Sequence, residues 1–455
     1  MKVAFVASEA VPYAKTGGLA DVVGTLPGHL RKRGVEAVTF LPKYSGIKGT
    51  CIDEFDIEMR GRHHVRIFQD GDFYFIDYPE YYERTGLYGT EKGDFKDNCE
   101  RFTLFCKAVI VLLKKWHFDI VHCHDWQSGL VPLYIKEQAI PAKSVFTIHN
   151  LGYQGKFPRR AFPLLGISKS YYTPEGIEYY GDINFLKAGI LYADRVTTVS
   201  ETYAREIQTP ELGFGLDGVL RTRRAQLIGI VNGIDYRQWN PETDKSINRT
   251  YGDYTGKQTN KDYLAGECHL DPGAPLIGMV SRIAEQKGFD ILVKAFDDMM
   301  TMGFGFVLLG FGDEQYHMKL KRFESVYRCR VCVNIKFDNT LAHRIYAGSD
   351  FFLMPSQYEP CGLGQLISLR YGTVPIVRAT GGLADTVTEF RSETMRGNGF
   401  VFSNYTSSAL VSALSRAHEV YQKKQVFEQL SEKCMTYDFS WKKSAEKYLA
   451  MYNAL

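Results

Sequence analysis

Short apolar runs alternate with longer amphipathic stretches along the first half of the chain. Residues 2–7 form an apolar run, which precedes a glycine-containing loop at residues 15–18 and a helical pattern over residues 19–33 that Gly34 ends. This order predicts a strand, a glycine loop and a helix. Further strands of this half are predicted at residues 35–41, 119–123, 144–148 and 195–199.

A polar segment at residues 232–261 interrupts this alternation and predicts an inter-domain connection. A second series of buried strands follows, at residues 276–280, 305–309, 331–335, 351–354 and 374–377. Repeated strand–helix alternation favours parallel sheets that helices cover on both faces. The sequence therefore predicts an α/β protein.

The chain of 455 residues indicates two domains, because a single hydrophobic core rarely grows beyond roughly 250 to 300 residues. We expect an amino-terminal domain at residues 1–235, a second domain at residues 236–440, and an amphipathic helix at residues 441–455 that packs back on the first. A net charge of +3 is too small to predict nucleic acid or an anionic membrane as a partner. The first apolar run is too short for a signal peptide or a membrane span, so we expect a cytoplasmic protein.

The nine cysteines are scattered and odd in number, which is untypical of a disulfide scaffold and predicts reduced thiols. Cys329 and Cys332 form a single CxxC. A second pair at zinc-ribbon spacing is missing from the sequence, which disfavours a metal role for this motif.

The loop after the first strand reads KTGGLAD, from Lys15 to Asp21. Gly17 and Gly18 allow a ligand to approach the backbone, amides at a helix start attract anions, and Lys15 adds a positive charge. The alternative is an ordinary turn with a solvated lysine. A GxG sequence at residues 310–312 lacks the third glycine of the dinucleotide fingerprint, which disfavours an oxidoreductase.

Polar residues also follow two later strands of this half. In the sequence HCHDW, His122 and His124 would share one side of a strand, which permits a metal pair, whereas Asp125 suits a cleft carboxylate or a helix cap. His149 and Asn150 follow the next strand, where a lone histidine is often only a hydrogen-bonding group. Ligands of open α/β sheets bind beyond these strand ends.

The second half repeats this arrangement. Arg282 and Lys287 follow one buried strand and could bind one anionic ligand, although two solvated charges are the simpler interpretation. Glu359 follows another strand, before a turn of small residues. It stands between Tyr358 and Pro360, which disfavours a position on the face of a helix. The GGLAD sequence at residues 381–385 repeats the letters of the first loop and predicts a second close approach of backbone to a ligand.

Together these motifs resemble those of bacterial glycogen synthases and plant starch synthases, the ADP-glucose type of glycosyltransferase family 5. The matching sequences are KTGGLAD, FTIHNLGYQG at 146–155, SRIAEQKG at 281–288, EPCGL at 359–363, RYGTVPIVRATGGLADTV at 370–387 and DFSW at 438–441. They occur in family order over essentially the whole chain. The resemblance implies the GT-B fold, with two Rossmann-like parallel-sheet domains that face a central cleft.

The resemblance also implies the reaction. Glucose would be transferred from ADP-glucose to the non-reducing 4-hydroxyl of an α-1,4-glucan, with retention of configuration. The departing phosphate would help to deprotonate the acceptor in a front-face displacement, while protein groups position the reactants and stabilise charge. We expect no metal and no other cofactor, since the glycine-rich turns at residues 15–18 and 359–363 lack an adjacent DxD pair. The oligomeric state stays open.

By position, the resemblance assigns a role to each motif residue. The implied catalytic residues are Glu359, His149, Lys15, Arg282, Lys287 and Asp125. The implied substrate-binding residues are Gly17, Gly18, Asp21, Asn150, Asn232, Phe337, Cys361, Gly362 and Leu363. Glu359 would contact the glucosyl hydroxyls, Arg282 and Lys287 the distal phosphate. Lys15 and its glycines would close over that phosphate, and Phe337 would stack on adenine.

One residue departs from the family pattern: Gly364 stands where a threonine is common, which removes a hydroxyl expected near the phosphates. Three other functions remain as alternatives. A phosphorylase would need a pyridoxal phosphate lysine and normally a longer chain, a sugar-nucleotide epimerase shares the fold, and a glucan-binding protein would lack catalysis. The intact set of charged motif residues disfavours the last of these.

Overall fold

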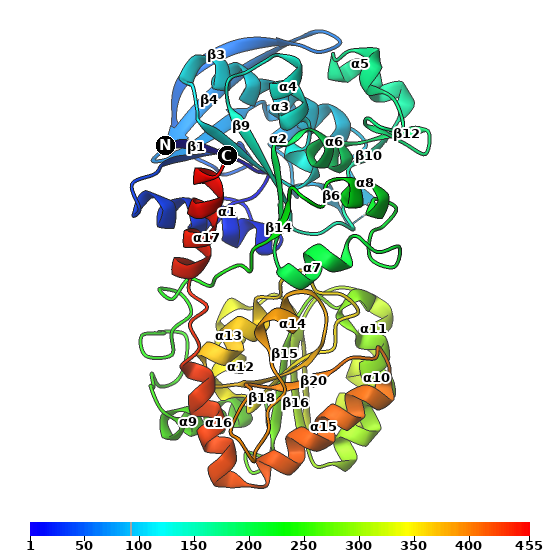
Figure 1. Cartoon of the computed structure of the whole chain (residues 1–455). Helices are drawn as coiled ribbons and strands as arrows, with labels where there is room; N and C mark the ends of the chain where they lie inside the picture. Colours follow the sequence, from blue (N-terminus) through cyan, green and yellow to red (C-terminus); the bar gives the residue numbers. More distant parts are fainter. Residues whose placement is uncertain (92) are drawn as a thin grey trace. The chain divides into compact units, whose positions relative to one another are not determined.

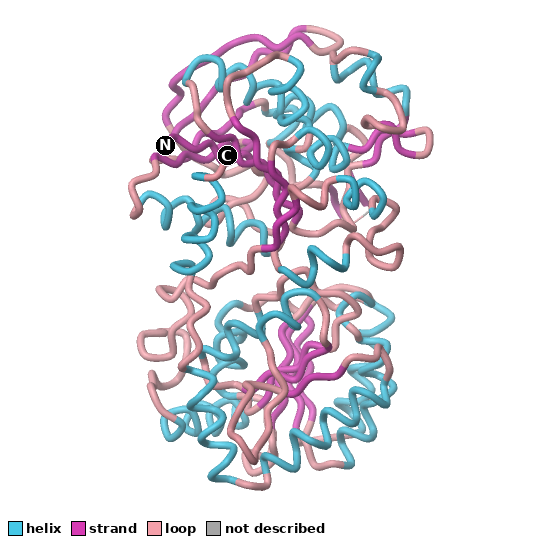
Figure 2. Tube along the Cα trace, in the orientation of Figure 1, coloured by secondary structure: helices cyan, strands magenta, loops and turns pink. Residues whose placement is uncertain are grey.

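The computed structural model describes residues 1–91 and 93–455, and this part of the chain divides into two compact units. Unit 1 consists of Met1–Ile230 and Trp441–Leu455, and unit 2 consists of Val231–Ser440. In each unit the strands form a central layer that helices flank, as Figure 2 shows. Unit 2 begins at residue 231 rather than 236, because Ile234 pairs with Ser440 and donates its amide hydrogen to the Phe439 carbonyl.

Unit 1 contains a nine-stranded sheet in the order β14-β13-β9-β8-β1-β2-β5-β4-β3. The strands are β1 (Lys2–Val6), β2 (Glu36–Pro42), β3 (Thr50–Glu58), β4 (Arg62–Asp70), β5 (Phe73–Asp77), β8 (Ile120–His124), β9 (Lys143–Ile148), β13 (Arg195–Thr198) and β14 (Leu227–Gly229). All neighbours are parallel except that β4 runs antiparallel to both β3 and β5. The hairpin of β3 and β4 was not predicted, because its residues are mostly polar and exposed at the sheet edge.

The helices of unit 1 follow its strands as predicted for strand–helix alternation (Figure 1). They are α1 (Gly18–Arg31), α2 (Pro79–Tyr82), α3 (Asn98–Trp116), α4 (Leu130–Glu137), α5 (Phe162–Leu165), α6 (Phe185–Tyr192), α7 (Glu201–Glu206) and α8 (Asp217–Thr222). Two small sheets are added to this frame. One pairs β6 (Gly89–Thr90) with β7 (Gly93–Asp94), and the other has the order β10-β12-β11, with β10 (Lys156–Pro158), β11 (Glu178–Tyr179) and β12 (Asp182–Asn184).

The carboxyl-terminal helix α17 (Trp441–Asn453) belongs to unit 1 and packs against α1. Trp441 and Tyr448 are buried in one apolar cluster with Val22 and Leu26 of α1. The Tyr452 hydroxyl lies 2.6 Å from Nδ1 of His122 in β8. The amphipathic pattern of this segment therefore marks a face that is buried on the first sheet.

Unit 2 contains a six-stranded, fully parallel sheet in the order β17-β16-β15-β18-β19-β20. Its strands are β15 (Leu276–Val280), β16 (Gly305–Gly310), β17 (Val331–Ile335), β18 (Phe351–Met354), β19 (Val374–Arg378) and β20 (Phe400–Phe402). Its helices are α9 (Tyr254–Glu267), α10 (Phe289–Thr301), α11 (Glu314–Val326), α12 (Asn339–Gly348), α13 (Gly364–Arg370), α14 (Gly381–Thr386), α15 (Ser407–Tyr421) and α16 (Lys424–Met435).

Strand β16 shows why the strands of unit 2 read as unbroken apolar runs. Phe306 and Leu308 belong to one buried cluster, whereas Val307 and Leu309 belong to another. Successive side chains of a strand point to opposite faces, so both faces of this sheet are covered. A strand buried on both faces has no position for a polar side chain.

Residues 232–261 are not a free connection, in contrast to the prediction. The segment lies within unit 2, where Asp244 Oδ2 accepts hydrogen bonds from His343 and Tyr371. Tyr251 donates to the Tyr371 carbonyl and is itself buried. The polar residues that suggested a linker are instead buried hydrogen-bonding partners, which the sequence pattern does not distinguish from solvated ones. Within the described helices, none is long and apolar enough to cross a membrane.

The packing of α17 predicts a large effect of one substitution. Trp441 is buried almost completely, so Trp441→Ala should lower the free energy of unfolding by about 3 to 5 kcal/mol, through lost burial and the cavity left behind. Denaturant titration followed by circular dichroism measures this loss. Lys442→Ala on the exposed side of the same helix is the control, and equal effects of the two substitutions would contradict the packing.

Candidate functional site

In unit 2 the structure brings Lys287 and Glu359 into direct contact. The strands that precede them, β15 and β18, are neighbours in the sheet, so their following loops leave the same edge. Lys287 Nζ lies 2.8 and 2.6 Å from the two Glu359 carboxylate oxygens, and Ser356 Oγ donates to the same carboxylate at 2.9 Å. The Glu359 and Lys287 side chains are 8% and 18% exposed, so water screens the pair weakly.

A close approach of two loops makes this ion pair possible. Gly288 ends the short turn Glu285–Lys287 with a φ of 80°, and a Cβ there would collide with the Pro355 carbonyl oxygen. Only glycine combines this left-handed conformation with this proximity. The last glycine of the SRIAEQKG motif is therefore required to place Lys287 beside the carboxyl end of β18.

The second GGLAD sequence packs against protein rather than lying open to a ligand. Gly382 donates its amide hydrogen to the Glu359 carbonyl at 3.2 Å. A Cβ on Gly381 would collide with the Glu359 carbonyl, and one on Gly382 with that of Cys361. The predicted close approach is thus made to the Glu359–Cys361 backbone. These glycines support the turn that carries Glu359.

Asn232 lies against the same turn from the start of unit 2. Its backbone N–H donates to the Cys361 thiol, and burial raises the pKa of that thiol to about 12, so Cys361 stays a neutral thiol. Asn232 Oδ1 is buried without a hydrogen-bond partner among the residues that the structure describes. A buried amide oxygen that accepts no hydrogen bond from the protein is typical of a site where a ligand supplies the donor.

The remaining predicted residues of unit 2 follow strands β15, β17 and β18, at the carboxyl edge of its sheet. Arg282 is exposed and its Nη2 lies 3.5 Å from Gln286 Oε1. Phe337 follows β17 and is 91% exposed, which is unusual for a phenylalanine and leaves its ring open to a stacking ligand. Gly362 has a φ of 71°, and Leu363 precedes α13, so both shape the turn after Glu359.

The departure at Gly364 has a packing explanation. Gly364 is the first residue of α13, and a Cβ there would lie 2.7 Å from Phe352 Cε1 and 3.3 Å from Met354 Sδ. Phe352 is completely buried, so its ring has little freedom to move aside. A threonine at this position would therefore require a rearranged core beneath the turn.

In unit 1 the KTGGLAD loop is held by a residue that sequence reasoning missed, Glu9. Its carboxylate accepts hydrogen bonds from the Thr16 amide, from Thr16 Oγ1 at 2.6 Å and from the Gly17 amide at 3.3 Å. Two of the amides expected to attract an external anion are thus already bonded. Gly17 remains open on its Cβ side, with nothing within 4 Å, so a ligand can still approach there.

Lys15 and Asp21 of this loop form an ion pair with an Nζ to Oδ1 distance of 2.7 Å. The Lys15 side chain is 44% exposed, which leaves it able to exchange partners. Burial raises the pKa of Asp21, and Lys15 offsets part of that rise. Gly18 begins α1, so its position at the helix start agrees with the motif.

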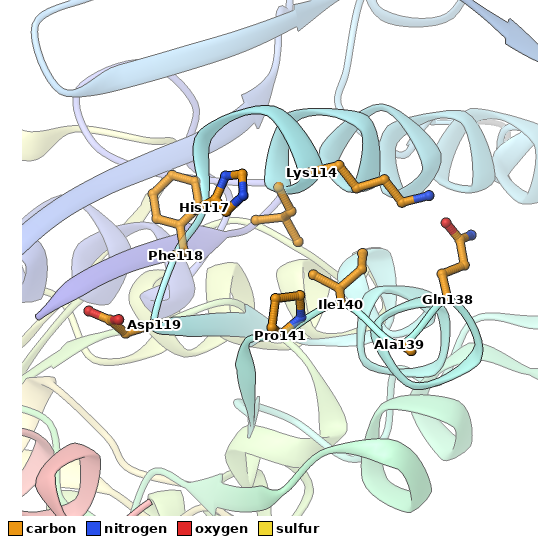
Figure 3. A pocket seen from close by; sticks show the side chains of 9 residues that line it. Lys114, His117, Phe118, Asp119, Gln138, Ala139, Ile140 and Pro141 are labelled. Atoms are coloured by element: carbon orange, nitrogen blue, oxygen red, sulfur yellow. The ribbon is translucent and has the colours of Figure 1, made fainter.

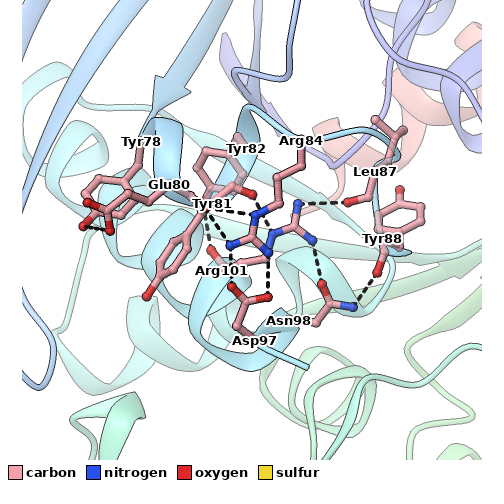
Figure 4. A network of polar contacts seen from close by, with 10 residues as sticks. All are labelled: Tyr78, Glu80, Tyr81, Tyr82, Arg84, Leu87, Tyr88, Asp97, Asn98 and Arg101. Atoms are coloured by element: carbon pink, nitrogen blue, oxygen red, sulfur yellow. Dashed lines mark hydrogen bonds and ion pairs between the residues drawn. The ribbon is translucent and has the colours of Figure 1, made fainter. Parts of the chain in front are cut away.

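A buried network holds Glu9 in turn, and Figure 4 shows its inner part. The Tyr88 hydroxyl donates to Glu9 Oε1 at 2.6 Å, while Asn98 Nδ2 donates to the Tyr88 carbonyl at 2.9 Å. Arg101, which is completely buried, donates to Asn98 Oδ1 and to the Leu87 carbonyl. An arginine within the largely apolar helix α3 was the available sequence signal for the network, but Glu9 lies 79 residues before its partner Tyr88 and carries no signal of its own.

The predicted residues Asp125, His149 and Asn150 meet at the carboxyl ends of β8 and β9. Asp125 Oδ1 accepts the His149 amide hydrogen at 2.7 Å, and the same carboxylate accepts that of Asn150. Burial raises the pKa of Asp125 to about 7 against these two bonds. Burial also lowers the pKa of His149 to about 3, so its imidazole is neutral near pH 7.

The alternative of a metal-binding histidine pair does not fit the contacts. His122 and His124 do lie on one side of β8, with ring centroids 4.2 Å apart. Yet His122 is bonded to Tyr452 and Thr147, and His124 Nδ1 lies 2.9 Å from His149 Nε2. Both histidines are buried hydrogen-bonding groups whose pKa values burial lowers.

A cavity of about 350 Å³ lies at the opposite edge of the unit 1 sheet. Its walls are the segments before β8 and before β9, as Figure 3 shows with His117, Asp119 and Gln138. None of the predicted site residues lines it. In α/β sheets, ligand sites form at the carboxyl ends of strands, so this cavity is not the candidate site.

Two solved structures resemble the whole chain. The catalytic domain of starch synthase IV from Arabidopsis thaliana, bound to ADP and acarbose, has a TM-score of 0.89 at 33% identity, with 99% of this chain and 98% of that chain covered. Sucrose-phosphate synthase from Thermosynechococcus elongatus has a TM-score of 0.65 at 18% identity over 100% and 98% of the two chains, which indicates the fold alone. The two α/β units, with charged loops at their strand ends, define a glycosyltransferase of the GT-B class.

The family follows from two sequence profiles and from curated relatives. The profile of the starch synthase catalytic domain matches residues 2–222, and that of glycosyl transferases group 1 matches residues 267–433. Glycogen synthase of Geotalea daltonii is 46% identical over 99% of this chain and 98% of its own, and that of Thermodesulfovibrio yellowstonii is 41% identical over 100% and 98%. The chain belongs to the glycogen and starch synthase family.

The raised pKa of Asp125 predicts how stability depends on pH. A carboxyl that binds its proton more tightly in the folded state stabilises the fold at low pH, and this contribution is lost as the pH rises from about 4 through 7. Asp125→Asn removes the titrating carboxyl and keeps an oxygen that can accept the His149 amide hydrogen. It should therefore reduce the dependence of the unfolding free energy on pH in this range, whose slope is at most about 1.4 kcal/mol per pH unit. Urea titrations of both proteins between pH 4 and 8 measure the difference. Parallel curves would show that Asp125 is ionised throughout.

Proposed function

We propose that the protein lengthens an α-1,4-glucan by transferring glucose from ADP-glucose to the non-reducing 4-hydroxyl, with retention of the α configuration. The observation that carries the proposal is the Lys287–Glu359 pair at the shared exit of β15 and β18, in a chain of the glycogen and starch synthase family. A cation and a carboxylate at one strand edge suit a ligand that carries both phosphates and hydroxyls.

In unit 2 we assign the residues at the carboxyl edge of the sheet to the binding of the sugar-nucleotide donor. Lys287 and the exposed Arg282 would bind the distal phosphate of the donor, because both carry positively charged N–H donors at the sheet edge. Glu359 would then accept hydrogen bonds from the glucosyl hydroxyls. Phe337 offers an exposed ring for adenine, and Asn232 Oδ1 offers a buried acceptor for a substrate hydroxyl.

In unit 1 the proposed roles rest on the loops after β1, β8 and β9. Lys15 would exchange Asp21 for a phosphate oxygen, while Gly17 leaves the loop backbone open on one side. His149 is neutral, so it would contact the sugar as a hydrogen-bonding group rather than as a cation. Asp125 fixes the His149 and Asn150 backbone through its two accepted hydrogen bonds.

The proposed chemistry needs no protein nucleophile. The bond from the anomeric carbon to the ADP phosphate would break while the acceptor oxygen attacks from the same face, and the departing phosphate would take the acceptor proton. Positive groups that stabilise the leaving diphosphate lower the barrier to this step. Glu359, already bonded to Lys287 and Ser356, would orient the sugar rather than attack it.

The donor is tested directly by comparing ADP-glucose with UDP-glucose at steady state, with glycogen as the acceptor. Release of nucleoside diphosphate and growth of the polymer are measured together. A higher kcat/KM for ADP-glucose, with both products formed in step, is the expected result. Diphosphate release without polymer growth would instead indicate an epimerase or a hydrolase.

Removal of the Glu359 carboxylate should reduce turnover more than donor binding. In Glu359→Ala, Lys287 loses its partner but keeps its charge for the phosphate, so the Kd for ADP should change little. Loss of a positioned transition-state contact typically costs on the order of a hundredfold in kcat. Calorimetric titration with ADP and steady-state kinetics measure the two effects. Near-normal turnover in a folded Glu359→Ala protein would end this assignment.

We propose further that no divalent metal is required, because Lys287 and Arg282 of unit 2 carry positive charges that can neutralise a diphosphate. Activity should therefore persist in EDTA, and Lys287→Ala should lose about tenfold or more in kcat/KM. Lys294→Ala, which removes an exposed lysine from α10, is the control for charge alone. Activity that EDTA abolishes and Mg²⁺ or Mn²⁺ restores would contradict this proposal.

A further inference from the structure

A buried pair of histidines lies at the carboxyl ends of β8 and β9. His124 Nδ1 is 2.9 Å from His149 Nε2, so one of these two nitrogens donates a hydrogen to the other. Both imidazoles are neutral near pH 7, because burial lowers their pKa values. Each ring therefore carries one N–H and one unprotonated nitrogen. The position of the His149 proton decides whether its other nitrogen donates to a ligand or accepts from it.

The contacts of His124 fix its ring. His124 is completely buried, and its ring stacks on that of Phe5 with a centroid distance of 5.8 Å and an interplanar angle of 16°. The His122 ring centroid lies 4.2 Å from that of His124. Ser128 Oγ accepts the His124 amide hydrogen at 2.7 Å and so holds the backbone. The His124 ring therefore has little freedom to turn away from His149.

The outer nitrogens of the two rings have different environments. His124 Nε2 is buried and forms no hydrogen bond with any residue that the structure describes. His149 is 9% exposed, so water or a ligand can reach its Nδ1. A hydrogen on the first nitrogen would have no acceptor, whereas a hydrogen on the second can be donated.

This difference determines where the two protons of the pair lie. One proton occupies the hydrogen bond between the rings, and the other lies on one of the two outer nitrogens. On His124 Nε2 it would form a buried N–H without an acceptor, which is rarer in proteins than a buried acceptor without a donor. The environment therefore favours His124 as the donor within the pair and an Nδ1–H on His149.

We propose that His124 is a positioning residue: its Nδ1–H donates to His149 Nε2 and so directs the His149 proton to Nδ1, where it donates to a hydroxyl oxygen of the transferred sugar. The sugar contact rests on the proposed function, whereas the proton positions do not. Asp125 accepts the His149 amide hydrogen, so the backbone and the ring of His149 are both held in the structure without a ligand.

The proton positions can be measured by ¹⁵N NMR of protein labelled only at its histidines, because protonated and unprotonated ring nitrogens resonate in separate ranges. The chain contains 11 histidines, and the spectrum of His149→Gln identifies the His149 signals by their loss. We expect the parent to carry Nδ1–H on His149. An Nε2–H on His149 in the parent would overturn the proposal, and this measurement requires no change to His124.

His124→Met tests whether His124 controls the His149 proton. The methionine sulfur can accept a hydrogen bond but cannot donate one, and its flexible chain adapts to the space that the ring leaves. We expect the His149 proton to move to Nε2 and kcat/KM for ADP-glucose to fall by about tenfold, with KM for glycogen unchanged. His122→Met is the control, because it removes a buried histidine of the same strand but leaves the bond to His149, so the proton should stay on Nδ1.

The two parts of the proposal fail in different ways. A His149 proton that stays on Nδ1 in folded His124→Met would show that His124 does not direct it, which ends the positioning role. A proton that moves while kcat/KM stays unchanged would exclude the donated hydrogen bond to the sugar. If the parent does not use ADP-glucose but its His149 proton still responds to His124→Met, the proposed donor is wrong and the positioning role stands.

Discussion

The ion pair between Lys287 and Glu359 is the contact on which the functional edge of unit 2 depends. A carboxylate that is only 8% exposed must be paired, because an isolated buried charge costs several kcal/mol. The pair forms only if the loops after β15 and β18 approach each other, and Gly288 permits that approach beside the Pro355 carbonyl. In the proposed function, phosphate oxygens of the donor would replace Glu359 as the partner of Lys287, and glucosyl hydroxyls would replace Lys287 as the partner of Glu359. The ion pair stabilises both charges in the structure without a ligand.

The glycine motifs of the two units look alike in sequence but act differently. In unit 2, Gly381 and Gly382 allow α14 to pack on the Glu359–Cys361 backbone. In unit 1, Gly17 meets no atom within 4 Å of a Cβ, and its amide is bonded to Glu9. Gly381 and Gly382 therefore support the turn that carries Glu359, whereas the backbone at Gly17 remains accessible. The same sequence motif thus has two different environments, which only the surrounding atoms distinguish.

Unit 1 positions its loops through buried polar contacts. Arg101 and Asn98 hold the Tyr88 backbone, Tyr88 holds Glu9, and Glu9 holds the amides of Thr16 and Gly17. Hydrogen bonds in such a network are strong in the low dielectric of the protein interior when every polar group in it has a partner. The loop that presents Lys15 is therefore prepared before any ligand binds.

The sequence by itself determined the strand–helix order, the parallel sheets and the family, because apolar runs of strand length and intact motifs are local signals. Strands β15, β17 and β18 occur at the predicted residues, and in β15 and β18 burial on both faces leaves no polar position that would obscure the ends of the strand. Tertiary structure alone decided which polar residues are buried partners. Asp244 lies in a polar segment that reads as a linker, but it accepts hydrogen bonds from His343 and Tyr371. Glu9 belongs to no recognisable motif, yet it holds the loop at Thr16. These contacts join residues that are far apart in the chain or hidden by an ordinary local sequence, and no local pattern specifies them.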